Sequence, residues 1–285
     1  MFKTFEMELA GRPLIIETGK MAKQANGAVL VRYGDTAVLV ATTASKEPRE
    51  GTDFFPLTVD YEEKMYAVGK MPGGFLRREG RPGNSAILCA RLIDRPIRPL
   101  FDKRCRNDIH VVATVLSVDY DNAPELCGMI GASASIGISD IPWDGPIAGV
   151  RVGRVDGKYV INPTQEEMAA STMNVTVAGS EEAIMMVEGG AQEAPEEEVL
   201  DAIMFGHETI KEICRFQKKI IEEVGKEKRV LTFPEVPAEI ENDVEAFATE
   251  SLKKAIFDAD KLRRDGNIAA AKKAAMEHFA EIYPE

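Results

Sequence analysis

One loop of this sequence combines the two types of side chain, aromatic and guanidinium, that single-stranded nucleic acid requires of a binding site. Residues 73–82 hold too many glycines and prolines for a helix or strand, and they bring together Phe75, Arg77, Arg78 and Arg81. Single-stranded RNA needs both residue types, because bases stack on an aromatic face and guanidinium groups pair with phosphate oxygens. The same residues also fit a surface turn whose arginines pair with nearby carboxylates. The loop alone therefore allows two interpretations, an RNA contact or a structural turn.

The loop begins a basic island in an acidic chain. The net charge is −12, which argues against general wrapping of nucleic acid, because affinity for a polyphosphate comes mainly from Lys and Arg. Residues 77–106 nevertheless hold nine basic side chains against three acids, Glu79, Asp94 and Asp102, a local charge of about +6. Within this window Arg91, Arg95 and Arg98 recur at helical spacing and share one face. We expect at least some of them to form ion pairs with Asp94 and Asp102 rather than to bind RNA.

The remaining reactive side chains favour structural roles. The four cysteines, Cys89, Cys105, Cys127 and Cys214, show no CxxC pairing and no spacing shared with the histidines, so they indicate buried thiols in a reducing compartment. We expect His207 to pack on a helix, and neither His110 nor His278 has a visible acid or cysteine partner. Ser133 and Ser135 lie among small residues typical of packing, and residues 196–198, all Glu, suit a helix N-terminus.

The loop and the basic island must be positioned by the strands and helices that flank them. We expect strands at residues 27–33, 36–43, 54–61, 109–120, 148–155, 173–178 and 183–188. Gly34-Asp35, Gly157-Lys158 and Gly179-Ser180 are the expected turns. A helix should begin at Ser85 and end before Pro96 and Pro99, and a small-residue helix should cover residues 126–138.

The C-terminal third is expected to be helical. Pro195 suits a first helical turn, and an apolar stripe continues from it to Gly225. Residues 233–237 read as a linker, followed by amphipathic helices at 239–257 and 268–283. We therefore expect two domains, residues 1–232 and 233–285. The second is small for independent folding, so the chain is expected to be part of a longer protein. No run approaches the roughly 20 apolar residues of a membrane helix, and we expect a cytoplasmic protein without membrane contact.

Four long strings resemble one known family. They are ETGKMAKQANGAVLVRYGDTAVLVATT (17–43), FFPLTVDYEEKMYAVGKMPGGFLRREGRP (54–82), ARLIDRPIRPLF (90–101) and SDIPWDGPIAGVRVGRVDG (139–157). In this order they are similar to the first RNase PH-like core of bacterial polynucleotide phosphorylases, and the similarity extends into the helical region. The resemblance implies an α+β fold of the RNase PH-like (ribosomal protein S5 domain 2-like) type.

The resemblance also implies an activity and partners. Family members degrade RNA by processive 3′-to-5′ phosphorolysis, in which inorganic phosphate attacks the terminal phosphodiester and releases a nucleoside diphosphate, supported by Mg²⁺. They carry a second core and form ring-shaped homotrimers. The expected partners are single-stranded RNA, that second core, the other protomers and, for some members, an RNA degradosome.

Two motifs of the catalytic cores differ in this sequence. In such cores an Asp-Gly pair is followed by a cluster of Ser and Thr residues that binds phosphate. At the matching position this chain has Asp-Asn-Ala-Pro-Glu, residues 121–125. Ala123 and Pro124 carry no hydroxyl, and Glu125 is itself an anion. The Asp-x-Asp motif that binds metal corresponds to Thr172-Met173-Asn174, which offers no carboxylate.

The sequence therefore predicts a core without catalytic or metal-binding residues of its own. It would serve as scaffold and RNA guide, with Phe75, Arg77, Arg78 and Arg81 as the RNA contacts and Arg91, Arg95 and Arg98 as RNA or structural residues. Mg²⁺ and phosphate would bind elsewhere in the parent enzyme, and the isolated chain should self-associate weakly at most. A non-enzymatic RNA-binding subunit of an exosome-like ring is the main alternative. A self-contained metal nuclease would need a carboxylate cluster that the sequence does not show.

Overall fold

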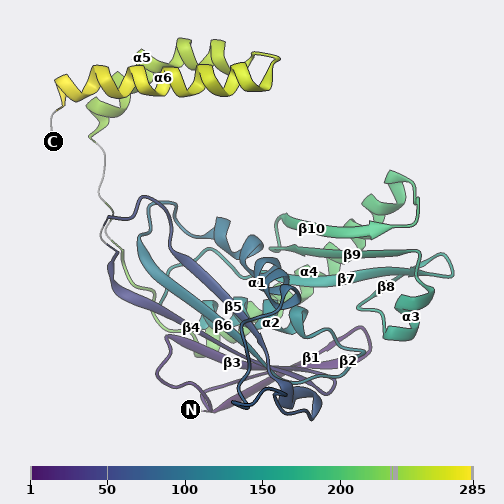
Figure 1. Ribbon diagram of the computed structural model, residues 1–285. Helices are drawn as coiled ribbons and strands as arrows, with labels where there is room; N and C mark the ends of the chain where they lie inside the picture. The colour runs from purple at the N-terminus through teal and green to yellow at the C-terminus, as the bar shows by residue number, and fades with distance from the viewer. Residues whose placement is uncertain (1, 50, 232, 234–236, 284–285) are drawn as a thin grey trace. The chain divides into compact units, whose positions relative to one another are not determined.

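The computed structural model describes residues 2–49, 51–231, 233 and 237–283 and divides the chain into two compact units, Met1–Leu231 and Thr232–Glu285. The first unit holds two β-sheets and four α-helices, and the second holds two helices (Figure 1). Each unit is described by itself.

A six-stranded sheet forms one half of the first unit. Its strand order is β1-β2-β3-β4-β6-β5. All neighbours are antiparallel except β5 and β6, which are parallel. The bounds are β1 (Lys3–Leu9), β2 (Arg12–Thr18), β3 (Gly27–Tyr33), β4 (Thr36–Pro48), β5 (Leu57–Glu63) and β6 (Asn107–Ser117).

The first two strands of this sheet were not expected from the sequence. In β1 the apolar residues Phe5, Met7 and Leu9 alternate with exposed polar residues, the period of a half-buried strand, so the signal was present and was overlooked. The β1–β2 turn is formed by Ala10 and Gly11, whose φ angles are +49° and +74°. Two consecutive positive φ values suit the twist of a hairpin, and the glycine lowers the cost of that conformation.

A four-stranded antiparallel sheet forms the other half, in the order β10-β9-β7-β8. Its strands are β7 (Ala148–Val155), β8 (Lys158–Ile161), β9 (Met173–Gly179) and β10 (Ile184–Ala191). Strand β8 was missed, and the turn at Gly157 joins β7 to β8. The short helix α3 (Gln165–Ala170) was also missed, although Thr164 and Glu167 form a complete capping box at its start.

Helix α2 (Pro124–Ile138) lies at the centre of the first unit, where it contacts strands of both sheets as well as α1 (Asn84–Ile97) and α4 (Glu196–Val224). Every residue from Leu126 to Ile138 is buried. Gly131 permits this approach, because a Cβ there would lie 2.5 Å from a methyl carbon of Val40. The Ser135 and Thr42 hydroxyls, 2.6 Å apart, satisfy each other inside this contact.

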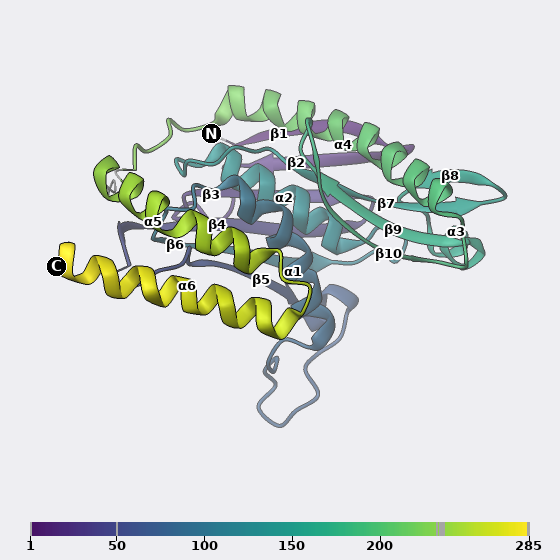
Figure 2. The ribbon, with the colours of Figure 1, turned by 90° about the horizontal axis from the view of Figure 1, so that it is seen from above.

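Helix α4 runs along the four-stranded sheet (Figure 2). Gly206 makes this contact close, since an added Cβ would meet a methyl carbon of Val152 at 2.9 Å. The helix ends at Gly225, as the sequence predicts.

Helix α1 does not end where the sequence analysis placed its end. Pro96 lies inside the helix, which continues to Ile97 and leads into a 3-10 turn, η2 (Arg98–Leu100). Proline is tolerated there because it removes only one hydrogen bond in the last turn, and Arg98 N–H still bonds to Asp94 O. The expected strand at residues 54–61 starts three residues later, at Leu57, after Pro56.

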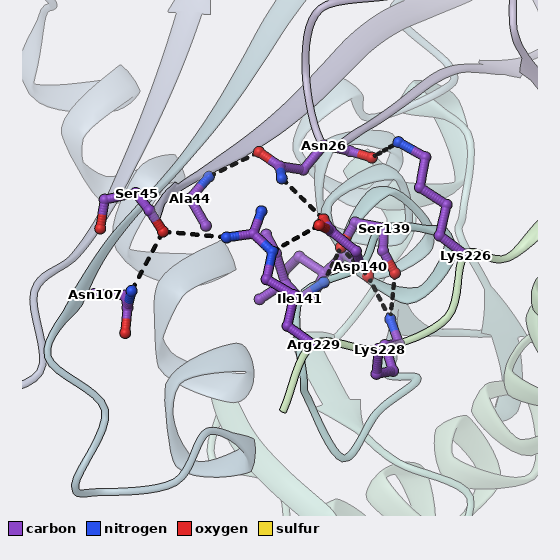
Figure 3. A network of polar contacts seen from close by, with 11 residues as sticks. Asn26, Ala44, Ser45, Asn107, Ser139, Asp140, Ile141, Lys226, Lys228 and Arg229 are labelled. Atoms are coloured by element: carbon purple, nitrogen blue, oxygen red, sulfur yellow. Dashed lines mark hydrogen bonds and ion pairs between the residues drawn. The ribbon is translucent and has the colours of Figure 1, made fainter. Parts of the chain in front are cut away.

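The segment that follows α4 is fixed to the core by a polar network (Figure 3). Lys228 donates to three carbonyl oxygens at the end of α2, those of Ile136, Gly137 and Ser139, at 3.1, 2.8 and 2.7 Å. These are among the carbonyls that an α-helix leaves unpaired at its C-terminus, where a cation is also favoured by the helix dipole. Burial lowers the pKa of Lys228.

Arg229 extends the same network to the large sheet. Its Nε donates to Asp140 at 2.6 Å and its Nη1 to the Ser45 carbonyl at 3.1 Å. Asn26 donates to the other Asp140 oxygen at 2.8 Å and accepts the backbone N–H of Ala44. Residues 226–229 are therefore anchored to α2, β4 and the start of β3 at once.

The second unit is an antiparallel pair of helices, α5 (Ala238–Ile256) and α6 (Lys261–Ile282). Helix α6 begins seven residues before the expected position, because Asp260 caps it by accepting the Arg263 N–H. The His278 ring stacks on Phe247 with centroids 4.4 Å apart. Of the expected linker at 233–237, residues 234–236 lie outside the described residues. Among the helices of the described segments, none is long and apolar enough to cross a membrane.

We expect Asp140→Asn to destabilise the first unit by about 1–3 kcal/mol at pH 7, because it removes the charge from the Arg229 hydrogen bond. Arg229 lowers the pKa of Asp140 from 3.8 to about 2. A depressed folded-state pKa contributes stability above the unfolded value and loses it as the pH falls through the folded value. The difference between the two proteins should therefore shrink below pH 4, as measured by urea unfolding at pH 7, 4.5 and 3.

Glu227→Gln is the matched control, because Glu227 lies in the same segment and is exposed, without an ion pair in the part of the chain that is described. It should leave the unfolding midpoint unchanged at all three pH values. A pH-independent loss in Asp140→Asn would contradict the charge-based account.

Candidate nucleic-acid interface

The arginine-rich loop is held at its two ends and exposed between them. It connects the 3-10 turn η1 (Met65–Val68) to α1, and Figure 2 shows it extending away from the sheets. Phe75 is 100% exposed, and Arg77 has a φ of +51°, a conformation that turns the chain at this point. Glu79 accepts the backbone N–H of Met65 at 2.8 Å and so ties the second half of the loop to η1.

Two adjoining hollows lie beside this loop. The first, of about 520 Å³, is lined by Arg78 and Arg81 together with the end of β5. The second, of about 340 Å³, runs along α1 past Arg91. Both share Tyr61, Pro82 and Ala86, so they form one continuous depression from the loop to α1.

The basic island divides into paired and unpaired arginines. Arg98 forms an ion pair with Asp94 at 2.7 Å and donates to the Phe55 and Leu57 carbonyls. Arg95 pairs with Glu188 at 3.1 Å. Arg104, rather than a helix arginine, pairs with Asp102 at 2.8 Å, and its hydrogen bonds lower the pKa of Asp102 to about 2. Among the described residues, no carboxylate partner is found for five arginines of the island. Arg106 instead donates to three backbone carbonyls, and the other four are Arg77, Arg78, Arg81 and Arg91.

This division bears on the two interpretations of the loop. A structural turn would place its arginines on local carboxylates, and the carboxylate inside the loop, Glu79, bonds a backbone N–H instead. Within the described segments, the side chains of the loop arginines make one hydrogen bond. In it Arg77 donates to the Pro72 carbonyl over a long distance, 3.5 Å. Their charges are therefore available to an external anion.

The two motifs that differ from catalytic cores converge on a third cavity, of about 380 Å³. Glu125, in the first turn of α2, and Asn174, on β9, both line it. Ala123 occupies the N-cap of α2 without a side-chain hydrogen bond. The Glu125 carboxylate lies 2.5 Å from Arg151, so an anion of the chain itself already occupies the positive end of the helix.

A metal site finds no support in these side chains. No group of three or more His, Cys, Asp or Glu residues in the described ranges is placed to hold a metal ion. Asn174 offers an amide and no carboxylate, and the two carboxylates that line the cavity, Glu125 and Glu188, are paired with Arg151 and Arg95. The residues present do not fit Mg²⁺, which prefers carboxylate oxygens.

The sequence interpretation of His110 was wrong in one respect. Its Nε2 lies 2.7 Å from the Asp60 carboxylate, a partner fifty positions away in sequence. The parallel pairing of β5 with β6 aligns Thr58 with His110 and so places Asp60 diagonally beside it. His207 is buried with Nε2 3.0 Å from the Ser180 carbonyl, in the packing role that was expected.

The cysteines show no feature of a nucleophile. All four are free thiols; three are buried and Cys89 is half-buried. Burial raises the pKa of Cys89, Cys127 and Cys214 to about 12, which disfavours the reactive thiolate.

Sequence reasoning missed three residues that line the third cavity, Arg151, Thr176 and Glu188. They occupy one row across β7, β9 and β10, opposite each other in register. Their signal in the sequence is a polar residue interrupting an apolar strand, but the strand pairing that brings them together is not visible there.

Comparison with known proteins identifies relatives of this chain. Residues 10–142 match the 3′ exoribonuclease family, domain 1, and residues 145–209 match domain 2 of the same family. Over 99% of its length the chain is 58% identical to a polyribonucleotide nucleotidyltransferase of Syntrophomonas wolfei and 56% identical to one of Heliobacterium modesticaldum. The chain spans 40% of the length of each of these relatives.

A solved structure shows the same fold. The crystal structure of rice Rrp46 matches with a TM-score of 0.57 and 15% identity, over 78% of this chain and 94% of that one. At this identity the likeness concerns the fold alone. Together with the family matches, it confirms the RNase PH-like α+β fold.

We expect Arg98→Ala to lower the free energy of unfolding by about 1–3 kcal/mol, because it leaves Asp94 and two carbonyls without their charged donor. The triple variant Arg77→Ala, Arg78→Ala, Arg81→Ala should change it by less than about 0.5 kcal/mol, as is usual for exposed positions. Urea unfolding followed by circular dichroism measures both. Equal losses in the two variants would show that the loop arginines are structural.

Proposed function

Because this chain belongs to the 3′ exoribonuclease family, we propose that it forms the first, RNA-guiding core of a polyribonucleotide nucleotidyltransferase. The parent enzyme would degrade RNA from the 3′ end by phosphorolysis. Inorganic phosphate attacks the terminal phosphodiester, the bond to the penultimate nucleotide breaks, and a nucleoside diphosphate leaves. The proposal rests on relatives that are named polyribonucleotide nucleotidyltransferases, and the chain spans 40% of the length of each of them.

The observation that carries the RNA-guiding role is the division of the basic island. Arg77, Arg78 and Arg81 lack carboxylate partners in the described part of the chain and stand beside the fully exposed Phe75. Ring and guanidinium groups in one exposed loop match the two faces of a single strand, its bases and its phosphates. Arg91 lines the adjoining hollow and joins this set, whereas Arg95 and Arg98 act structurally.

Electrostatics limits how this surface can work. A chain with a net charge of −12 repels RNA at long range, so attraction must arise from close contacts. At physiological salt the Debye length of about 8 Å screens the distant acids from a phosphate at the loop. The loop would therefore capture a strand weakly and locally, which suits a guide along which RNA must move.

We also propose that this core performs no phosphorolysis. The nucleophilic phosphate needs an anion pocket, and Glu125 occupies that position together with Arg151. The metal needs carboxylates, and Asn174 and Thr172 offer none. Phosphate and Mg²⁺ would therefore be used at a second core of the longer protein.

The proposed partners are those that the resemblance to polynucleotide phosphorylases implies. They are single-stranded RNA, a second core, two further protomers in a homotrimer and, for a cytoplasmic enzyme, an RNA degradosome. The alternative of a non-enzymatic subunit in an exosome-like ring would use the same RNA loop. Assaying the longer polypeptide separates the two, because the alternative requires it to lack phosphate-dependent activity.

Replacing Arg77, Arg78 and Arg81 together with Ala should weaken binding of oligo(A) and lower the slope of log K against log salt. Each lost phosphate contact to a single strand accounts for about 0.7, or about two for the three positions. Fluorescence anisotropy of a labelled oligo(A) at several salt concentrations measures both quantities. Parental affinity and slope in the triple variant would refute the guiding role.

Phe75→Ala should reduce affinity and leave the salt slope nearly unchanged, because stacking releases no counterions. The expected loss is about 1–3 kcal/mol for one stacked base. Phe2→Ala serves as a control, since Phe2 is also an exposed phenylalanine but lies outside the loop. An equal effect of the two variants would count against stacking at Phe75.

The chain of residues 1–285 should release no ADP from poly(A) in phosphate and Mg²⁺, because its anion position holds Glu125 and its metal position holds Asn174. Product analysis with and without phosphate, against a heat-inactivated control, tests this. Phosphate-dependent ADP formation above the control would show that this core is catalytic.

A further inference from the structure

The third cavity is built on one face of the four-stranded sheet. Strand register places Arg151, Thr176 and Glu188 opposite one another on β7, β9 and β10. The next row on the same face consists of Gly153, Asn174 and Gly190. Neighbouring residues such as Val150, Val152 and Val177 point to the other face, towards Gly206 of α4. Helix α1 and the first turn of α2 close the remaining sides of the cavity.

The charges of this cavity are already balanced. Its charged lining residues are Glu125, Arg151 and Glu188. Arg151 lies 2.5 Å from Glu125, and Glu188 lies 3.1 Å from Arg95. A phosphate group would find the Arg151 cation already paired with Glu125, although its buried Nε has no partner among the described residues, and would meet two carboxylates. The cavity therefore disfavours an anion.

Its neutral polar groups, by contrast, lack partners. Thr176 is only 7% exposed and lines the cavity, and no hydrogen bond of its hydroxyl exists within the described residues. The Asn174 amide lines the same space, also without a hydrogen bond in the described ranges. The Thr176 hydroxyl is not among the buried atoms that lack a partner, so it is accessible from the cavity, where a ligand or water can bond to it. These two side chains present adjacent donors and acceptors to whatever occupies the cavity.

The other walls are apolar or lack side chains. Leu88 and Leu92 of α1 form the apolar side, and Gly190 opens the edge next to Asn174. A Cβ at Gly190 would meet no atom within 4 Å, so the space beside Asn174 is free. The cavity thus combines an apolar wall with a hydrogen-bonding floor, and each of its charged lining residues is paired with an opposite charge, Glu188 with Arg95 outside the lining. A flat, uncharged heterocycle with donors and acceptors on its edge has this complementary chemistry.

We propose that this cavity is a nucleobase-binding site. The base lies against Leu88 and Leu92, and its polar edge bonds the Asn174 amide and the Thr176 hydroxyl. An Asn amide can donate and accept side by side, the pattern that pairs with adenine. The base belongs either to a free nucleoside or to a nucleotide of bound RNA. The site is separate from the arginine loop and does not depend on it.

Isothermal titration calorimetry of the 285-residue chain with adenosine, inorganic phosphate and oligo(A) tests this assignment. Thr176→Val removes the hydroxyl at nearly constant volume, and Gly190→Val places a branched side chain where an added Cβ meets no atom within 4 Å. Each should weaken adenosine binding at least about tenfold, the effect of losing one well-formed hydrogen bond or the space itself. Inorganic phosphate should not bind at the cavity or compete with adenosine.

Thr114→Val is the matched control, because Thr114 lies on β6 and does not line the cavity. Urea unfolding establishes that all variants remain folded. If the base comes from RNA, the two cavity variants weaken oligo(A) binding with an unchanged salt slope and adenosine alone binds weakly or not at all. The triple arginine variant lowers that slope, so failure of the loop and failure of the cavity give different results.

Two results would overturn the proposal. The first is that Thr176→Val and Gly190→Val bind adenosine and oligo(A) with the affinity of the parent chain, or that neither ligand binds at all. The second is competition between phosphate and adenosine that Glu125→Gln strengthens, which would identify an anion site instead.

Discussion

The structure depends on the complete burial of α2 between the two sheets. A helix buried on all sides must carry small residues, and Gly131 against Val40 shows how little space remains. Burial also prevents water from satisfying the N–H and C=O groups that every helix leaves unpaired at its ends. At the C-terminal end Lys228 donates to three carbonyls. At the N-terminal end Glu125 supplies a negative charge held by Arg151. Both charges have the sign that the helix dipole favours.

These two ends connect the core to the rest of the molecule. The cation at the C-terminal end belongs to the segment after α4, so the same contact that caps α2 also fixes where the chain leaves the first unit. The anion at the N-terminal end lies in the cavity formed with β9 and β10. Because α2 is rigidly packed, the cavity and the anchored segment are held at a fixed separation. Charged residues that serve this purpose are not available for RNA.

The sequence predicted those features that depend on local pattern. Small residues at 126–138 predict a buried helix, and an apolar stripe that stops at Gly225 predicts α4. Strand β1 and helix α3 were overlooked although both have a local signal. In β1 apolar and polar residues alternate, and before α3 Thr164 and Glu167 form a capping box. Arginine spacing did not show which side chains are paired: Arg95 finds Glu188 only through the packing of α1 beside β10, a contact between residues 93 positions apart. The residues of the loop were visible in sequence, whereas the cavity arises from strand register and was not.

The contrast between the two sites explains how a fold of this family can keep its shape without a ligand. At the start of α2 the chain provides its own anion, so a negative charge lies at the positive helix end and pairs with Arg151 without phosphate. In the loop the opposite holds, because Glu79 bonds a backbone amide and leaves the neighbouring guanidinium groups to external partners. A side chain paired within the protein contributes to stability, and one left unpaired beside a hollow is available to an external partner. The distribution of carboxylates, more than the number of arginines, therefore determines which positive charges of this acidic chain remain available to an external anion.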